Sequence, residues 1–277
     1  MHKHIVLVRI LAHLRLKPAA FRVIDTHAGA GRYDLFASEP SRSGEWRAGI
    51  GRLWEASREE PPPPLLSAYL DAVLALNPDG ALRFYPGSPV IVAGLLRPQD
   101  RLIACEVEPD AEALLAKSLR GRANAKAVVL DGWMALGAYI PPKERRGLVL
   151  IDPPFEDVNE FNRLPEALSA AYRKWPTGIY LLWYPIKERA APDALARQLR
   201  RCAISNILRA ELLLRPSRPE AGLVGSGLVV VNPPYRLDQD LRAFLPALAK
   251  LLSPQASVRT EWLVRPRQFG RPSSIEG

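Results

Sequence analysis

Cysteine, histidine and long apolar runs are all scarce in this chain of 277 residues. Its two cysteines, Cys105 and Cys202, are isolated, which gives neither a metal-ligand spacing nor a disulfide framework. Four scattered histidines are too few to predict a metal centre, so no metal is expected. No stretch is long and apolar enough to span a membrane, and no signal peptide opens the sequence. These absences predict a cytoplasmic protein in a reducing compartment, without a membrane partner.

Acidic residues are also in deficit. The chain carries 38 Lys and Arg against 29 Asp and Glu, a formal net charge of +9. Such a balance favours a polyanionic partner, because bound cations neutralise phosphates and release counterions. Arginines gather within residues 42–58, 120–122 and 197–201. Each cluster is equally consistent with a solvated helix face, so charge alone leaves both interpretations open.

Apolar periodicity predicts an α/β fold. The pattern indicates an amphipathic helix over residues 4–16, built on Ile5, Val8 and Leu11, and a strand over residues 21–25. Beyond residue 98 strands and helices alternate, which implies a doubly wound, mainly parallel sheet. The predicted strands are 101–106, 127–130, 148–151, 178–184, 207–214 and 223–231, with 258–264 as a candidate edge strand. The predicted helices are 109–119, 164–175, 193–202 and 239–252.

Residues 36–98 interrupt this alternation. Helical patterns there are broken by proline and glycine clusters at 61–64, 77–80 and 86–89. We therefore expect a core formed by residues 1–35 and 99–264, a helical insertion over 36–98, and a disordered polar tail over 265–277.

The tetrad Asp152-Pro153-Pro154-Phe155 follows an apolar run typical of a buried parallel strand. Its prolines restrict the backbone, so the turn directs the Asp152 carboxylate and a proline carbonyl into the cleft beyond the strand. Two adjacent acceptors fit the two N–H groups of an exocyclic amine, and Phe155 offers a face on which a base stacks. Fixed acceptors also stabilise the positive charge that develops when such an amine is methylated. By itself, the tetrad is equally consistent with a rigid turn.

Residues suited to a cofactor follow the predicted strands in order, and ligands of doubly wound folds bind beyond such strand ends. Glycines after the first strand let the backbone approach a ligand, and an acid after the second suits two ribose hydroxyls. Strand by strand, these residues are Gly29 and Gly31, Glu106, Asp131 with Gly132, and Asp152. The order is typical of an S-adenosylmethionine-dependent methyltransferase that acts on an amino group. Each acid taken alone could equally be a helix N-cap.

A second tetrad, Asn232-Pro233-Pro234-Tyr235, also follows an apolar run and fits the same template. Composition does not separate the two copies, but their order along the chain does. Asn232 comes two strands too late, so we expect it to end an edge hairpin, and Asp152 is the catalytic candidate.

Longer strings resemble a known family. Residues 25–33, 85–89 and 145–155 resemble the bacterial 23S ribosomal RNA adenine-N6 methyltransferase J family, as do residues 182–185 and 231–235. The resemblance runs from about residue 3 to residue 264. It implies a seven-stranded, Rossmann-like class I methyltransferase sheet with a small helical insertion.

The resemblance also implies an activity and its residues. The methyl group of S-adenosylmethionine would pass to the N6 amine of one adenine of 23S rRNA, adenine 2030, with Asp152 as the catalytic acid. The residues implied to contact the cofactor or line its site are Lys3, His4, His27, Ser88, Glu106, Asp131, Gly132 and Asp152. His27 could instead be a loop histidine that is satisfied by backbone groups.

The chain departs from the family at two places. The family's Asp-Pro-Pro-Tyr is Asp-Pro-Pro-Phe here, which keeps the stacking face and loses a hydroxyl. Family members also carry a segment rich in Tyr, Arg, His, Gly and Asn ahead of a Lys-His pair, which here is Lys3-His4. The resemblance therefore predicts retained cofactor binding and reduced RNA turnover by this chain.

Three rival functions stay open on the sequence. A DNA adenine-N6 methyltransferase would use the same clamp on a flipped base, although no DNA-specificity domain is recognisable. A dinucleotide oxidoreductase would use Gly29 and Gly31 as its phosphate loop, but it lacks the third glycine. A non-catalytic RNA-binding remnant would use the basic surface alone. A monomer is expected in each case.

Overall fold

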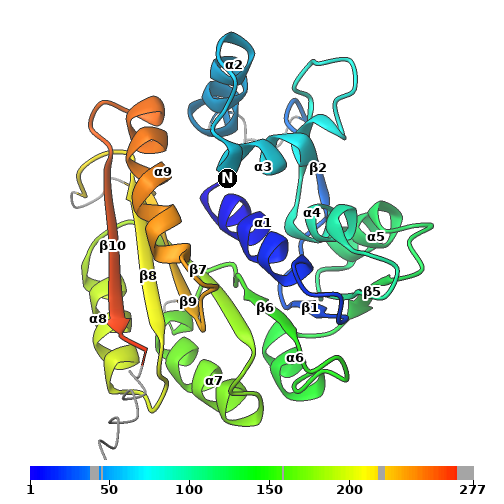
Figure 1. The fold of residues 1–277 in the computed structure, drawn as a ribbon, viewed down its shortest axis with the longest axis vertical. Coiled ribbons are helices and arrows are strands. Elements are labelled where there is room, and N and C mark those ends of the chain that lie inside the picture. Colours follow the sequence, from blue (N-terminus) through cyan, green and yellow to red (C-terminus); the bar gives the residue numbers. More distant parts are fainter. Residues whose placement is uncertain (38–43, 45, 158, 218–221, 267–277) are drawn as a thin grey trace, which may run out of the picture.

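The computed structural model describes residues 1–37, 44, 46–157, 159–217 and 222–266, and places an eight-stranded sheet at their centre (Figure 1). In spatial order the strands are β10 (Ser257–Val264), β8 (Ile207–Leu213), β9 (Gly225–Val231), β7 (Ile179–Ile186), β6 (Gly147–Ile151), β1 (Arg22–Asp25), β4 (Arg101–Glu106) and β5 (Ala125–Val129). The five strands from β5 to β7 are parallel, and β9 runs antiparallel between β7 and β8. This is the class I methyltransferase arrangement, so the predicted fold class is confirmed.

Two predictions about the far edge of the sheet need correction. The sheet has eight strands rather than seven, because the candidate strand at 258–264 pairs antiparallel with β8. The strand that precedes Asn232 is β9, which lies between β7 and β8 and not in an edge hairpin. β10 covers the hydrogen-bonding edge that β8 would otherwise expose.

Alternate residues of the strands face two separate helical layers. Leu148 and Leu150 of β6 belong to one core with α1, α4, α5 and α9, whereas Val149 and Ile151 belong to the other with α6, α7 and α8. The helix bounds are α1 His2–Arg15, α4 Ser88–Leu95, α5 Pro109–Ser118, α6 Gly132–Ala138, α7 Glu160–Lys174, α8 Ala190–Arg201 and α9 Leu237–Leu252. α6 was not predicted, because its seven residues are too few to show helical periodicity.

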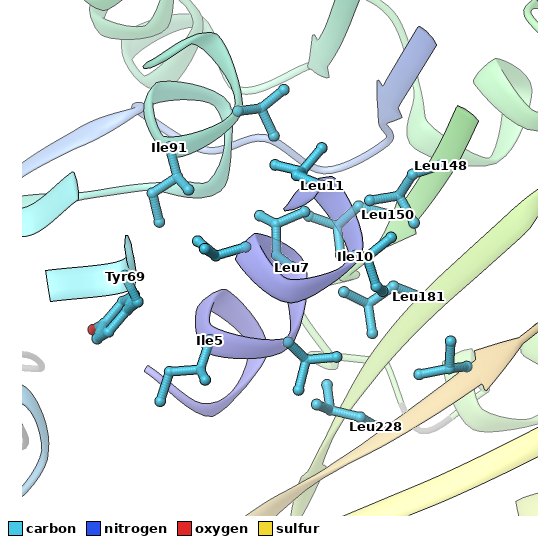
Figure 2. Packing of buried hydrophobic residues seen from close by; sticks show 14 of the residues in the cluster. Ile5, Leu7, Ile10, Leu11, Tyr69, Ile91, Leu148, Leu150, Leu181 and Leu228 are labelled. Atoms are coloured by element: carbon cyan, nitrogen blue, oxygen red, sulfur yellow. The ribbon is translucent and has the colours of Figure 1, made fainter. Parts of the chain in front are cut away.

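Helix α1 is buried on more than the single face predicted for an amphipathic helix. Besides Ile5 and Leu11, both Leu7 and Ile10 are fully buried, and Figure 2 shows them between Tyr69 and Ile91 on one side and the sheet on the other. The second face of α1 is covered by α4 and by α3 (Pro64–Leu74). This double burial holds the first turn of α1 in a fixed place over the sheet.

The segment predicted as an insertion contains helices and one strand of an unpredicted two-stranded sheet. The helices are η1 (Arg47–Gly51, a π-helix), α2 (Arg52–Glu59), α3 and α4. Strand β2 (Arg32–Asp34), just before the segment, pairs antiparallel with β3 (Phe84–Pro86) inside it, so this strand pair closes the segment at its base. Residues 38–43 and 45 of this segment, and residues 267–277 of the predicted tail, lie outside the described residues.

Candidate active site

The carboxyl ends of β1, β4 and β6 bring three acidic residues to one edge of the sheet. Asp25 ends β1, Glu106 ends β4, and Asp152 directly follows β6. In the sheet β1 lies between β4 and β6, so the chain leads from β1 to β4 on one side and later to β6 on the other. Doubly wound folds bind their ligands at such a switch point in strand order. The first turn of α1 points Lys3 at the same place.

Lys3 and Asp152 form an ion pair at this edge. The Lys3 ammonium group donates to Oδ2 of Asp152, and the two side chains are only 15% and 18% exposed. Burial by itself lowers the pKa of Lys3, but the Asp152 and Asp25 carboxylates outweigh it, so the pKa is raised from its usual value. Within the described part of the chain no hydrogen bond engages Oδ1 of Asp152, which leaves one carboxylate oxygen for a ligand.

Asp25 is a site residue that the sequence did not single out. Its carboxylate is fully buried, and among the described residues neither oxygen has a hydrogen-bond partner of good geometry. Burial raises its pKa to about 6, although Lys3 and the nearby Ser88 hydroxyl counteract part of that rise. Ser88 is itself buried at the start of α4. A buried carboxylate without donors is costly, so this position suits a ligand that brings its own N–H groups.

Glu106 and the glycine loop are held together by backbone hydrogen bonds. One carboxylate oxygen of Glu106 accepts from the Gly29 N–H at 2.8 Å, and the other accepts from Val107 and Glu108 N–H at 2.9 Å. Gly29 has φ +63°, and a Cβ there would lie 2.3 Å from the Tyr33 hydroxyl. The loop therefore needs glycine at this position, and it brings bare backbone close to the Glu106 carboxylate.

Asp131 has the N-cap role, one of the two that the sequence left as alternatives. Its Oδ1 accepts from the Met134 N–H at 2.9 Å, so it caps α6 as an ordinary N-cap residue. Gly132 beside it is buried, and a Cβ there would lie 2.3 Å from the Thr26 carbonyl oxygen and 2.5 Å from the His27 ring. The cap therefore leaves Oδ2 of Asp131 for a ligand while the glycine permits close packing.

His27 is satisfied by a side chain rather than by the backbone. Its Nδ1 lies 2.8 Å from the Thr26 hydroxyl. Its ring packs in a T-shaped arrangement with Trp133, with the two ring centroids 5.5 Å apart. Burial lowers the pKa of His27, which favours the neutral imidazole at physiological pH.

His4 reaches an aromatic pair that sequence reasoning did not connect with it. Its Nδ1 lies 2.9 Å from the Tyr85 hydroxyl, and the Tyr85 hydroxyl lies 3.0 Å from that of Tyr69. Burial lowers the pKa of His4 well below its usual value, so the ring is neutral. His4 and Tyr85 are 81 positions apart, and no local pattern signals their contact.

The tetrad after β6 presents an aromatic wall. Phe155 has φ +57°, an uncommon conformation for a bulky residue that is found mostly at functional sites. Its ring lies 4.8 Å from that of Phe161 and 5.8 Å from that of Trp183 on the neighbouring strand β7. Trp183 was absent from the predicted site, although it belongs to the Leu-Trp-Tyr-Pro string at 182–185.

The two tetrads lie at opposite ends of the strands. Val231, which precedes Asn232, pairs with Tyr180 at the start of β7, because β9 is antiparallel to β7. Asn232 has φ +52°, and its side-chain amide donates to the carbonyls of Pro176 and Gly178 at 2.7 and 2.8 Å. Its contacts are those of a loop clamp, and they lie away from Asp152.

Two further features bear on the sequence expectations. Among the described residues, no group of three or more His, Cys, Asp or Glu side chains is arranged to hold a metal ion, and no helix is both long and apolar enough to cross a membrane. Cys105 and Cys202 are both free thiols.

Comparison with known proteins identifies the family. The family model described as "Ribosomal RNA large subunit methyltransferase D, RlmJ" matches residues 18–264. The chain belongs to this family. Two curated relatives, both named Ribosomal RNA large subunit methyltransferase J, support the match. The one from Haemophilus influenzae is 39% identical over 264 residues, which are 94% of this chain and 93% of the relative. The one from Escherichia coli K12 is 38% identical, with 95% and 93% covered.

A solved structure agrees with the family assignment. The crystal structure of a Legionella pneumophila protein is 35% identical, covers 94% of each chain and has a TM-score of 0.86. Membership of the family confirms the resemblance that was based on the strings at 25–33, 85–89 and 145–155.

Proposed function

We propose that this chain transfers the methyl group of S-adenosylmethionine to the N6 amine of one adenine in 23S rRNA, yielding N6-methyladenine and S-adenosylhomocysteine. The observation that carries the proposal is the Asp152 carboxylate at the switch point, with Oδ2 held by Lys3 and Oδ1 open. The family to which the chain belongs supports rRNA as the substrate class.

The residues present fit S-adenosylmethionine. The Asp25 carboxylate suits the ammonium group of its methionine part. The Glu106 carboxylate accepts three backbone N–H groups and keeps a lone pair on the oxygen that faces Gly29 for a ribose hydroxyl. Val107 and Met134, which are 54% and 64% exposed, stand beside Glu106 and Asp131 and offer apolar surface to a planar base. Bound there, the cofactor supplies an electrophilic methyl group. The proposed lining is completed by Lys3, His4, His27, Ser88, Gly29, Gly31 and Gly132.

Asp152 and Pro153 would bind the amine of the target base. Oδ1 of Asp152 accepts one N–H, and the Pro153 carbonyl accepts the other, since no hydrogen bond to this carbonyl is seen between described residues. Lys3 fixes the orientation of the carboxylate through Oδ2. As the new N–C bond forms, the nitrogen gains positive charge that the two acceptors stabilise. One N–H proton is then released, with Asp152 as the nearest acceptor.

Phe155 and Trp183 would hold the base in place. Two aromatic rings beside the acceptors provide stacking faces for a base that has left its helix. The left-handed backbone of Phe155 costs on the order of 1–3 kcal/mol, which the surrounding aromatic contacts must offset.

In this proposal residues 1–35 and 99–264 form the catalytic core, residues 36–98 form an inserted unit, and the protein acts as a monomer. The substrate would place the reaction in the cytoplasm, where ribosomes are made.

The proposal is tested by transfer of a tritiated methyl group to deproteinised 23S rRNA and, separately, to DNA that lacks adenine methylation. We expect labelled rRNA and unlabelled DNA, with the label recovered as N6-methyladenine. Asp152→Asn should abolish transfer, whereas Asp157→Asn, an exposed aspartate in the same loop, should retain it. Label on DNA alone would replace the RNA assignment with a DNA methyltransferase. Tight NAD binding without S-adenosylmethionine binding, measured by calorimetry, would favour an oxidoreductase.

A further inference from the structure

A cavity of about 850 Å³ opens beside the proposed active site, between the paired strands β2 and β3, Trp46 and α5. Its volume lies within the range of about 300–1,000 Å³ typical of sites for small organic ligands. The lining combines aromatic rings with cations, namely Trp46, Phe84, Tyr85, Arg32, Lys117 and Arg122. None of these six belongs to the proposed catalytic or cofactor-binding set.

One layer of tyrosine separates this cavity from the active site. Tyr85 lines the cavity, and its hydroxyl lies 2.9 Å from Nδ1 of His4, the residue next to Lys3. Tyr33 also lines the cavity, and its hydroxyl occupies the space that a Cβ at Gly29 would need. A polymer that places one unit against Asp152 therefore has this cavity within reach of an adjacent unit.

The cavity is positively charged. In the part of the chain that the structure describes, neither Arg32 nor Lys117 forms an ion pair, and both side chains are exposed. The acid in the lining is Asp34, which pairs with Arg83 at 3.1 Å and accepts the Phe36 N–H at 3.0 Å. Arg83 lies outside the lining, so this ion pair neutralises Asp34 without using a cation of the cavity.

The aromatic groups give the cavity a second property. The Arg32 guanidinium lies 4.6 Å from the centre of the Phe84 ring, and the Arg83 guanidinium lies 5.2 Å from it. Aromatic faces next to cations are the means by which proteins bind single-stranded nucleic acid, since bases stack on the rings and phosphates meet the charges. A purely anionic ligand would not need the rings, and a purely apolar one would not need the charges.

We propose that this cavity binds an unpaired nucleotide of the RNA substrate that flanks the target adenine, with its base against Phe84 and its phosphate at Lys117 and Arg32. The inference rests on the proposed function, because it assigns a second contact to the same RNA. It makes the cavity a determinant of RNA affinity and position, separate from cofactor binding and from the methyl-transfer step.

Charge reversal on α5 tests the phosphate contact with a matched control. Lys117→Glu should raise the KM for 23S rRNA about tenfold and reduce the salt dependence of RNA binding by about one unit of slope, with kcat unchanged. Arg120→Glu makes the same charge change at an exposed position just beyond α5, outside the cavity, and should change KM less than twofold. Equal losses in the two variants would show a diffuse surface effect and overturn the assignment.

Phe84→Leu tests the stacking contact while keeping an apolar side chain in β3. We expect RNA affinity to fall roughly 5- to 100-fold by fluorescence anisotropy and to recover in Phe84→Tyr. Thermal unfolding and the Kd for S-adenosylmethionine should match the wild type. A parallel loss of cofactor affinity would make the cavity part of the cofactor site and overturn the inference, as would unchanged RNA affinity in a folded variant.

The outcome separates the inference from the proposed function. RNA binding that depends on Lys117 and Phe84 without any methylation would keep the cavity assignment and refute the activity. Methylation of rRNA by the wild type, with no effect of either variant, would keep the activity and refute the cavity assignment.

Discussion

Replacing Asp25 with asparagine should flatten the pH dependence of stability and weaken binding of S-adenosylmethionine. The wild-type carboxylate is fully buried and receives no hydrogen bond of good geometry from a described residue, and burial raises its pKa from 3.8 to about 6. A raised carboxyl pKa means that the folded state holds a proton which the unfolded state has already released. Stability therefore falls as the pH rises through the window from about 4 to 6, and the loss is complete above it.

The magnitude follows from the shift. A difference between 3.8 and about 6 corresponds to about 3 kcal/mol, since one pKa unit is worth about 1.4 kcal/mol. Between pH 5 and pH 8 roughly half of this remains to be lost, about 1.4 kcal/mol, because the unfolded group is already ionised at pH 5. Asparagine is nearly isosteric and does not titrate, so this loss should vanish in Asp25→Asn.

The assay is urea unfolding of the wild type and Asp25→Asn at pH 5 and pH 8, together with calorimetry of S-adenosylmethionine binding at pH 8. We expect the wild type to lose about 1.4 kcal/mol more than the variant between the two pH values. The variant should bind the cofactor at least tenfold more weakly, because it lacks the anionic partner for the ammonium group. Asp71→Asn, at an exposed aspartate of α3, should match the wild type in both measurements.

Parallel pH profiles for the wild type and Asp25→Asn would refute the reasoning about burial. An unchanged cofactor Kd with an altered pH profile would keep the burial argument and remove Asp25 from the cofactor site. The two readouts therefore test the energetics and the function of the same carboxylate independently.

Three smaller predictions test neighbouring features. Gly132→Ala should lower the thermal midpoint and abolish cofactor binding, because its Cβ would meet the Thr26 carbonyl. In Gly137→Ala, in the same helix, the Cβ would make an ordinary contact with the Lys174 ammonium group at 4.0 Å, so this variant should be neutral or stabilising by up to about 1 kcal/mol. Equal effects in thermal melts would contradict this. Asn232→Ala should lower the free energy of unfolding in urea by about 1–3 kcal/mol and retain kcat, since the Asn232 amide donates to two carbonyls far from the site. A loss of kcat in a folded variant would refute this prediction. Lys3→Met should lose methyl transfer in the tritium assay, because the Asp152 carboxylate loses its fixed orientation. Normal transfer would exclude this role.

The sequence predicted those parts of the site that depend on short-range order. Glu106, Asp131 and Asp152 each follow an apolar run by one or two positions, so the end of a strand and its acid could be recognised together. Asp131 shows why such acids are ambiguous, because one of its oxygens caps α6 while the other stays open. The family strings supplied Lys3, which no periodicity marks.

The contacts that were not predicted join distant segments. Lys3 and Asp152 are 149 positions apart, and their pairing depends on how α1 packs between α3 and the sheet. The placement of β9 between β7 and β8 is also a long-range property, so the hairpin before Asn232 was wrongly predicted to lie at an edge. Asp25 resembles any other strand-end acid in sequence, and its burial arises only from the layers that close over it.

The charge distribution explains how a basic protein can have an acidic active site. Four carboxylates, at Asp25, Glu106, Asp131 and Asp152, converge at the strand ends, whereas the chain as a whole carries +9. Such a cluster of carboxylates attracts a cationic cofactor and repels phosphate groups. An RNA chain would therefore present a neutral base to Asp152. Its phosphates would need cations outside this cluster of carboxylates. Arg32 and Lys117 lie on the far side of Tyr33 and Tyr85 from the acids. There they would bind the phosphate of a neighbouring nucleotide, which leaves the target adenine free to reach Asp152.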